Sequence, residues 1–315
     1  MRTLSQLRVM GAKMKAKTWR TATLLLAFTM TAATVALPTG AGAQSGESPP
    51  QDQKSMADVA KQLNKQLNNP VADLSAMNFQ FNRYYLQGDV TDRTREQDVL
   101  NFQPVLPIHL TKEWNLITRP VIPFVFSSPD FEPGKGWDET SGLGDVAAVS
   151  LLSPAKLKDG LIWGAGPTFI FPTATNDTLG QGKYQAGPAA VGLYIGKDWV
   201  FGTLAQQWWS YAGDGDREST SQANIQYFIQ YLFGDQWQIG MAPNILIDWK
   251  EDQKNRFTVP IGLGIGKLVK IGPLPVKFTF EVDYMAIHPD EFGQHWGVRF
   301  QMIPVLPALF KDTLF

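Results

Sequence analysis

Histidines are the residues of this chain best suited to acid–base chemistry. His288 and His295 lie near Asp290 and Glu291, whereas His109 is distant in the sequence. A hydrolytic triad needs a nucleophile, a histidine base and an orienting group within hydrogen-bonding reach. No serine stands out near the two clustered histidines, and polar loop histidines are commonly only solvated. The sequence therefore predicts a protein that is not an enzyme. A lipid-modifying hydrolase is the less favoured alternative.

Two short motifs suggest an ion or a nucleotide site. Asp214-Gly-Asp216 clusters carboxylates in a glycine turn, as calcium sites do, but an ordinary tight polar turn is the favoured interpretation. Gly262-Leu-Gly-Ile-Gly266 superficially resembles a phosphate loop, yet it lies in a strand pattern and no helix follows. The chain has no cysteine, which excludes disulfides and a lipid-attachment thiol. We expect no metal and no cofactor.

Charged residues on one face of alternating apolar segments form the third candidate set. They are Arg119, Asp145, Asp248, Lys277, Glu281, Asp283 and Arg299. If residue 288 faces residue 294 across a turn, Asp283 lies opposite Arg299 and forms a cross-strand ion pair. Two interpretations remain open: these charges line a pore and set its selectivity, or they only solvate and brace an interior.

The segment from Trp237 to Trp249 indicates which kind of element carries such charges. Its odd-numbered positions are all apolar with tryptophan at both ends, and its even-numbered positions are mostly small or polar. A strand alternates faces at every residue. A lipid-facing strand needs an apolar band bounded by interfacial aromatic residues and backed by a wetter interior. The segment is therefore interpreted as a transmembrane β-strand.

The same alternation recurs along the chain and predicts an all-β, transmembrane antiparallel β-barrel of about twelve strands over residues 76–304. The strands expected before residue 200 are one around Phe79, 100–110, 114–126, two that flank the turn 153–160, and 184–195. The remaining strands are 199–211, 224–233, 237–249, 257–265, 276–284 and 296–302. Three-residue turns at 111–113, 196–198 and 234–236 contrast with longer polar connections at 87–98, 127–141, 173–183 and 212–222. Short periplasmic turns and long outer loops are typical of barrels. A soluble β-sandwich is the competing architecture.

Tryptophans that follow the short turns, Trp114, Trp199 and Trp237, predict a periplasmic aromatic ring. The predicted outer ring consists of Trp208, Trp209, Tyr211, Trp249 and Tyr284. Prolines within the expected strands remove ladder donors, so several bulges or local breaks must exist. They are Pro104, Pro107, Pro120, Pro123, Pro167, Pro188, Pro243 and Pro260.

The N-terminal residues 1–43 have the pattern of a signal peptide, with basic residues before an apolar stretch and Ala41-Gly-Ala43 as a cleavage site. Translation could start at Met1 or Met14. A leader and a short helix are expected in 44–75: Ser55 and Asp58 resemble a capping box, and Pro70 stops the helix. Its apolar stripe is Met56, Val59, Leu63 and Leu67. Residues 305–315 form a tail.

This helix is expected either inside the lumen as a plug or free on the periplasmic side. Small residues on three strands could receive a plug: Gly164, Gly166, Gly187, Ala189, Gly262, Gly264 and Gly266. A net charge of −1 argues against a nucleic-acid partner. The expected partners are outer-membrane lipid and, during biogenesis, the barrel-assembly machinery; the oligomeric state is open.

Several motifs, in this order, resemble a family of bacterial outer-membrane barrels. They include Asn101-Phe-Gln-Pro-Val-Leu-Pro107, Leu161-Ile-Trp-Gly-Ala-Gly-Pro167, Phe171-Pro-Thr-Ala-Thr175 and Trp296-Gly-Val-Arg-Phe300. The resemblance, over about residues 69–302, is to the family labelled "MetA pathway of phenol degradation". It implies a barrel in the outer membrane of a Gram-negative bacterium and suggests passive transport of small solutes, including aromatic or hydrophobic compounds. A structural or adhesive barrel with a closed lumen is the alternative.

Overall fold

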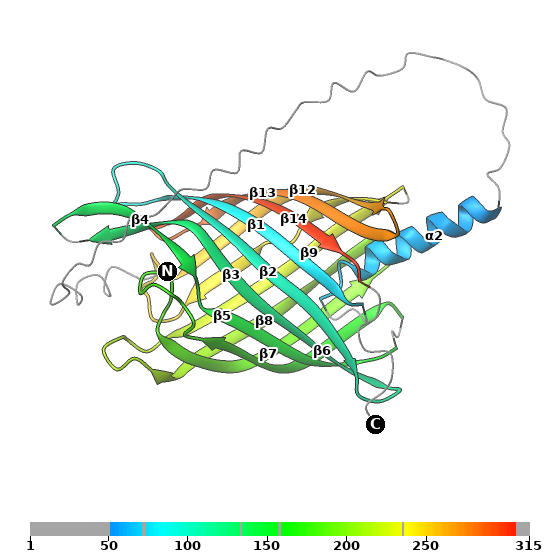
Figure 1. Ribbon diagram of the computed structural model, residues 1–315, viewed down its shortest axis with the longest axis horizontal. Helices are drawn as coiled ribbons and strands as arrows, with labels where there is room; N and C mark the ends of the chain where they lie inside the picture. Colours follow the sequence, from blue (N-terminus) through cyan, green and yellow to red (C-terminus); the bar gives the residue numbers. More distant parts are fainter. Residues whose placement is uncertain (1–50, 71–73, 133, 157–158, 235, 307–315) are drawn as a thin grey trace, which may run out of the picture.

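A closed antiparallel barrel makes up most of the computed structural model, which describes residues 51–70, 74–132, 134–156, 159–234 and 236–306 (Figure 1). The first strands are β1 (Ala76–Gln87), β2 (Arg95–His109), β3 (Trp114–Glu132), β4 (Gly136–Leu143), β5 (Val146–Pro154), β6 (Leu161–Phe171) and β7 (Lys183–Ile195). The others are β8 (Trp199–Gly213), β9 (Ser221–Phe233), β10 (Trp237–Met241), β11 (Asn244–Asp248), β12 (Phe257–Ile271), β13 (Leu274–Ile287) and β14 (Gly293–Pro304). The predicted signal peptide, the first leader residues and the tail from 307 lie outside the described residues.

We call each strand position around the barrel wall a stave, and the barrel has twelve staves, as predicted. Strands β10 and β11 are two halves of one stave, because both pair with β9 and β12 and only Ala242 and Pro243 separate them. Strand β4 pairs only with β3 and extends it as a hairpin beyond the barrel. The barrel closes where β14 pairs with both β1 and β13. The hairpin corrects the expectation of a loop at 127–141.

Strand pairing is interrupted at the prolines, which confirms the predicted breaks. Between β2 and β3, no pairs join 103–105 to 119–121, and these segments contain Pro104 and Pro120. The β5–β6 and β7–β8 ladders skip the residues around Pro167 and Pro188. Pro260 follows a register shift, and Pro243 lies in the break between β10 and β11. A proline has no N–H for the ladder, and these six prolines lie where the ladder is open. Pro107 and Pro123 differ, because they lie opposite Ile117 and Asn101 in continuous β2–β3 pairing.

The outer surface of the staves carries large exposed apolar side chains, as a lipid-facing wall requires. Trp199 and Trp237 are exposed at the end with the short turns, and Trp249 and Tyr284 are exposed towards the other end. Trp208 corrects the predicted outer ring: it is 5% exposed and faces inward, whereas its neighbour Trp209 is 51% exposed. Adjacent residues of a strand point to opposite faces, so both could not join one ring. None of the described helices is long and apolar enough to span a membrane.

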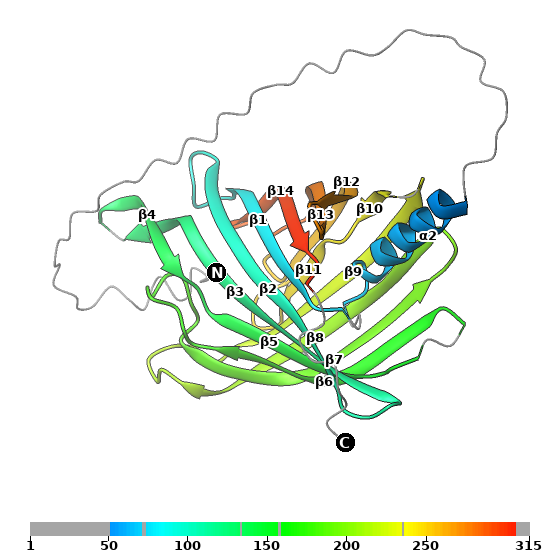
Figure 2. The same cartoon turned by 45° about the vertical axis from the view of Figure 1, so that its right-hand side comes forward.

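Helix α2 (Gln51–Gln66) lies at the end of the barrel with the short turns, and its C-terminal end enters the opening (Figure 2). We call this end the inner end and the opposite end, which carries the long loops, the outer end. The helix begins four residues before Ser55, so the predicted capping box is wrong. The predicted apolar stripe is also wrong as a contact surface, because Val59 is 67% exposed.

The small residues expected to receive the helix serve contacts within the wall instead. A Cβ at Gly166 would lie 2.0 Å from the Ser150 carbonyl oxygen, and one at Gly187 would lie 1.9 Å from that of Gln207. At Gly262 the nearest atom would be a carboxylate oxygen of Asp283, also at 2.0 Å. These glycines therefore allow neighbouring strands and lumen side chains to approach closely.

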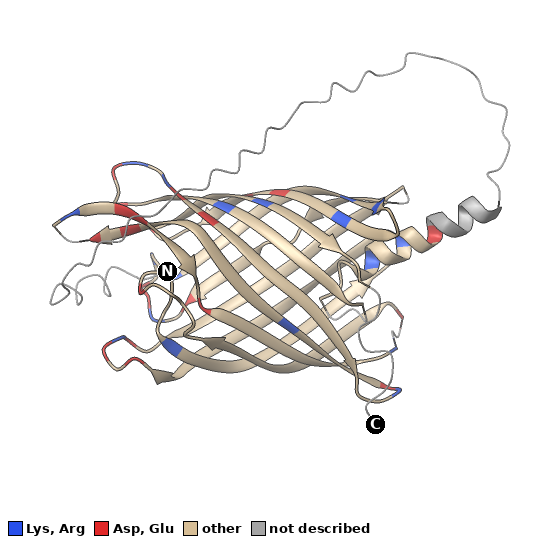
Figure 3. Cartoon of the chain, in the orientation of Figure 1, with Lys and Arg blue, Asp and Glu red and all other residues tan. Residues whose placement is uncertain are grey.

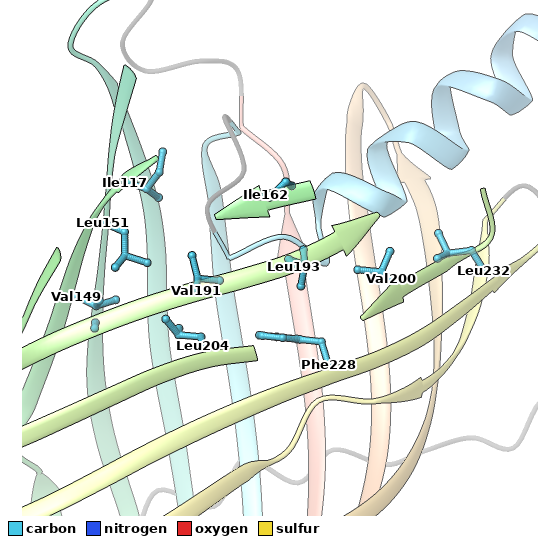
Figure 4. Close-up of a cluster of buried hydrophobic side chains, with 11 residues drawn as sticks. Ile117, Val149, Leu151, Ile162, Val191, Leu193, Val200, Leu204, Phe228 and Leu232 are labelled. Atoms are coloured by element: carbon cyan, nitrogen blue, oxygen red, sulfur yellow. The ribbon is translucent and has the colours of Figure 1, made fainter. Parts of the chain in front are cut away.

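The interior of the barrel has an apolar half and a polar half. The apolar half comes from β3 and β5–β9 and consists of Ile117, Val149, Leu151, Ile162, Ala189, Val191, Leu193, Val200, Leu204, Phe228 and Leu232 (Figure 4). The buried polar side chains of β1, β10, β13 and β14 form much of the polar half. Because β7 is apolar on both faces, it has no clear polar–apolar alternation, and the apolar half was not predicted.

Candidate functional site in the barrel lumen

Three cavities follow one another along the lumen. The outer cavity has a volume of about 480 Å³, the central cavity about 230 Å³ and the inner cavity about 90 Å³. Trp208, Asn224 and Leu246 line both the outer and the central cavities. Arg119 and Gln226 line both the central and the inner cavities. The three cavities are therefore neighbours along the lumen, and their volumes decrease towards the inner end.

The outer cavity is lined by apolar side chains and by acidic residues. Asp248, Glu251 and Glu291 contribute carboxylates, and Arg256 contributes one cation, which donates two hydrogen bonds to the Glu251 carbonyl. Figure 3 shows further acidic residues on the loops and hairpin at this end of the barrel. This mouth of the lumen is therefore acidic.

Trp208 separates the outer and central cavities. Its indole Nε1 donates a hydrogen bond of 3.0 Å to Thr168 Oγ1, and that hydroxyl donates in turn to the Ala148 carbonyl at 3.1 Å. Burying the indole with its N–H paired fixes a large flat side chain across the lumen. The sequence signal for this position is the alternation from Leu204, Gln206 and Trp208, all of which line the central cavity.

Arg299 lies at the centre of a buried ion network on β13 and β14. It lies 3.4 Å from Glu281 Oε1 and 3.3 Å from Asp283 Oδ2, and all three side chains are at least 95% buried. The predicted Arg299–Asp283 pair is confirmed as a contact, but the register is different. Glu281 lies directly opposite Arg299, and Asp283 lies opposite Gly297. A slip of two residues keeps every side chain on the same face, so the faces were correct although the register was not.

The break between β10 and β11 completes this network with backbone groups. The Ala242 amide donates to Glu281 at 3.0 Å, and the Ala242 carbonyl accepts from Arg299 at 2.9 Å and from Gln226 at 3.1 Å. These groups are free for side chains because Ala242 and Pro243 leave the ladder. Gly240, with a φ of 153°, precedes the break, where a Cβ would lie 2.0 Å from the Ile229 carbonyl oxygen.

Two further cations, the buried Lys277 and the half-buried Arg119, border the inner cavity without a carboxylate partner among the described residues. Lys277 Nζ donates to Asn68 Oδ1 at 2.6 Å, and Arg119 donates to the amide oxygen of Gln103. Both side chains line the inner cavity, and Arg119 also lines the central one. The predicted residues Arg119, Lys277, Glu281, Asp283 and Arg299 are thus brought together.

The other two predicted lumen residues lie elsewhere. Asp248 is the last residue of β11 and lines the outer cavity. Asp145 lies between β4 and β5, where its carboxylate accepts hydrogen bonds from the backbone amides of Ala174 at 3.2 Å and Gln181 at 2.6 Å. Asp145 therefore fixes the connection from β6 to β7 at the outer end and lines none of the three cavities.

Helix α2 is held in the inner mouth by a polar stripe. Lys61 contacts Asp198 at 2.6 Å, Lys65 Nζ donates to the Gly196 carbonyl at 2.7 Å, and Asn68 Nδ2 donates to Gln238 at 2.9 Å. Spacings of three and four place Lys61, Asn64, Lys65 and Asn68 on one helix face that continues past the last turn. The last turn of the helix therefore lies at the inner mouth, whereas its first turns lie outside; the plug hypothesis stays a prediction.

Charge–charge contacts at this mouth shift two pKa values. The hydrogen bond from Lys61 lowers the pKa of Asp198 below its ordinary value of 3.8. Burial lowers the pKa of Lys65 below 10.5, and the nearby charge of Lys61 acts in the same direction. The docked helix thus holds the ammonium groups of Lys61 and Lys65 close together. The carboxylate of Asp198, in the turn before β8, pairs with Lys61.

The other residues considered for chemistry make contacts within the fold. The rings of His288 and His295 stack with centroids 3.7 Å apart, and no hydrogen bond joins either to a serine among the described residues. Asp214 accepts a hydrogen bond from the Asp216 amide at 3.0 Å, which is the ordinary polar turn expected there. The glycine-rich segment 262–266 lies within β12, as predicted.

Comparisons with known proteins support the fold. No protein-family model matches the chain, and no curated protein matches its sequence. Among solved structures, the chain is similar to the COG4313 outer membrane channel from Pseudomonas putida F1. The two share 15% identity with a TM-score of 0.55, over 74% of this chain and 94% of that one. The chain has the fold of an outer-membrane β-barrel.

Two other similarities are weaker. The NanC porin shares 9% identity over 73% of this chain and 99% of that one, with a TM-score of 0.44. Outer membrane phospholipase A from Escherichia coli shares 11% identity over 74% and 97%, with a TM-score of 0.34. Such scores carry no argument about activity. The family name that the sequence resembles stays a resemblance.

Proposed function

We propose that this barrel is a passive channel for small solutes with apolar surfaces. The observation that carries the proposal is the succession of three neighbouring cavities along the lumen, each of which shares lining residues with the next. A solute that enters at the outer end meets both apolar and polar side chains along the lumen. Aromatic compounds are included among the candidate solutes because the sequence resembles a family labelled for phenol degradation.

The two-sided lumen supports solutes of this kind. Leu204 and Val149 line the central cavity, and Phe228 lines the inner one. Across the lumen, polar side chains such as Gln80 and Asn101 face the same space. An apolar solute can therefore lie along one wall while water stays hydrogen-bonded to the other, which lowers the cost of removing the solute from water.

Liposome swelling with reconstituted protein tests the proposal. We expect benzyl alcohol and similar small aromatic solutes to enter faster than a sugar. Replacing Leu204 with glutamine should reduce that preference, because it removes apolar lumen surface from the central cavity. The matched control is Leu161→Gln, because Leu161 is 54% exposed on the lipid-facing wall. Equal entry of aromatic solutes and sugars through the wild-type protein would contradict the proposal.

A closed structural barrel is the second candidate, and the occupied inner end is the observation that favours it. The end of α2 and the Arg299 network both narrow the inner cavity to about 90 Å³. Single-channel recording separates the two candidates. Absence of conductance in the full chain and in a folded variant that lacks residues 44–69 would favour the closed barrel.

A further inference from the structure

Lys277 is a buried cation whose hydrogen-bonding capacity is largely unused. Its side chain is 2% exposed, and its single hydrogen bond among the described residues goes to the neutral amide of Asn68. An ammonium group carries three donors. A buried charge without a counter-charge is costly to keep, and such groups commonly mark functional sites. Lys277 lines the inner cavity, so a bound group there could use its remaining donors.

A second cation lines the same cavity. One guanidinium nitrogen of Arg119 donates a hydrogen bond to the amide oxygen of Gln103, which is again a neutral partner. No carboxylate pairs with Arg119 among the described residues. A guanidinium presents five donors in a planar fork that matches a carboxylate. Thr279 adds a hydroxyl whose oxygen is buried without a hydrogen-bond partner and which also lines the cavity. Three side chains thus offer donors to one small space.

Among the described residues, Glu281 is the one carboxylate that lines this cavity, and its charge is already neutralised. Glu281 accepts from the Ala242 amide with both oxygens and pairs with Arg299 at 3.4 Å. Arg299 also pairs with Asp283, so the network uses its own charges. The charges left for a ligand at the inner cavity are those of Lys277 and Arg119, and both are positive.

We propose that the inner cavity binds the carboxylate of a small monocarboxylate with an apolar body. Apolar side chains also line the cavity: Ile303 lies beside Lys277 in the β13–β14 pairing, and Val105 and Phe228 contribute from β2 and β9. The ligand's body would lie against these side chains while its carboxylate meets Lys277 and Arg119. This proposal deepens the proposed channel function and rests on it for the route by which the ligand arrives.

The acidic outer cavity does not oppose this assignment. Glu291 is exposed, and Asp248 and Glu251 are only partly buried. Exposed charges separated by more than about 8–10 Å are screened at physiological ionic strength. Lys277, by contrast, is 2% exposed, where attraction to an anion is screened far less. The inner cations therefore determine which charge is bound.

The test compares benzoate with benzyl alcohol, because the two share a ring and differ in charge. Calorimetric titration of the detergent-solubilised full chain should give about tenfold or tighter binding of benzoate, as expected for charge-assisted hydrogen bonds. In Lys277→Met, benzoate binding should weaken by about tenfold and benzyl alcohol binding should be unchanged. The matched control is Lys267→Met, because Lys267 Nζ lies over the Trp237 ring on the outer wall, 4.6 Å from the ring centroid.

The wild-type comparison needs no variant, so the proposal stays testable if Lys277→Met fails to fold. Equal affinity for benzoate and benzyl alcohol would overturn it. Undiminished benzoate binding in both Lys277→Met and Arg119→Gln would also overturn it. Benzoate binding without liposome entry of any solute would leave the site standing and reject the channel. Liposome entry of solutes without tighter binding of benzoate would reject the site and leave the channel standing.

Discussion

The outer and inner cavities belong to one lumen but differ in size, burial and charge. The outer cavity measures about 480 Å³ and is bordered by Asp248, Glu251 and Glu291. The inner cavity measures about 90 Å³ and is bordered by the buried cation Lys277 and the half-buried cation Arg119. Both are made by strands of the same closed sheet. The difference comes from what the chain adds at each end: long polar loops outside, and helix α2 inside.

The energetic effect of a charge in the lumen therefore depends on how deeply that charge is buried. Attraction between charges grows as the surrounding dielectric falls, and so does the cost of leaving one unpaired. The outer acids contact solvent, so removing one should change little. The inner charges are more deeply buried, and those of the Arg299 network have several partners each, so removing one of these should change stability and conduction.

Removing Arg299 should have the largest effect. Arg299→Met leaves Glu281 and Asp283 buried without their counter-charge, and breaking a buried pair typically costs about 3–5 kcal/mol. Urea unfolding in lipid vesicles, followed by tryptophan fluorescence, measures the loss. The outer-cavity control is Arg256→Met, where we expect less than about 1 kcal/mol because the region is partly exposed. Equal losses would contradict the contrast between the two ends.

Removing the helix should have the next largest effect. A variant without residues 44–69 lacks the Lys61–Asp198 and Lys65–Gly196 contacts and opens the inner mouth. We expect single-channel conductance to rise several-fold, because the narrowest segment limits flow through cavities in series. The shift of the folded band on unheated gels confirms that the variant is a barrel. Unchanged conductance in the folded variant would mean that α2 does not limit the lumen.

The twelve staves could be predicted because alternation is a local property of each segment. In β12, for example, Ile261 and Leu263 are exposed while Thr258 and Leu268 are buried, so each residue's face can be inferred within a few neighbours. Register could not be inferred in this way. The pairing of Glu281 with Arg299 depends on the geometry of the turn after β13, and a slip of two residues satisfies the same alternation.

The parts of the site that were missed depend on contacts distant in sequence. The apolar half of the lumen breaks the expectation of a polar interior, because β7 is apolar on both faces. The orientation of α2 was missed because apolar residues were expected to face the barrel. The turns at Gly196 and Gln236 instead offer carbonyl acceptors to Lys65 and Asn64, so the polar face docks. No local pattern in the helix identifies those acceptors.

Trp208 should have a smaller effect because it lies on the wide side of the route. Trp208→Ala removes an indole that lines both the outer and the central cavities. In the full chain we expect little change in single-channel conductance, since the inner end limits flow. In the variant that lacks the helix, the same substitution should raise conductance clearly. Trp209→Ala is the matched control, because Trp209 is 51% exposed on the outer wall. A large increase in the full chain would place the limiting segment at Trp208.

The smallest expected effect is a pH dependence of helix docking. The hydrogen bond from Lys61 lowers the pKa of Asp198 in the folded protein, so the contact stabilises docking above the ordinary carboxyl pKa of 3.8. That contribution is lost as the pH falls through the lowered value, because a protonated Asp198 no longer pairs with the ammonium. Openings to the conductance of the helix-deleted variant should therefore become more frequent when the pH on the helix side is lowered below 3.8. Asp198→Asn should show such openings at neutral pH and lose the acid dependence. The effect is small because Asn64, Lys65 and Asn68 still hold the helix through hydrogen bonds. If the acid response persists unchanged in Asp198→Asn, a group other than Asp198 is responsible for it.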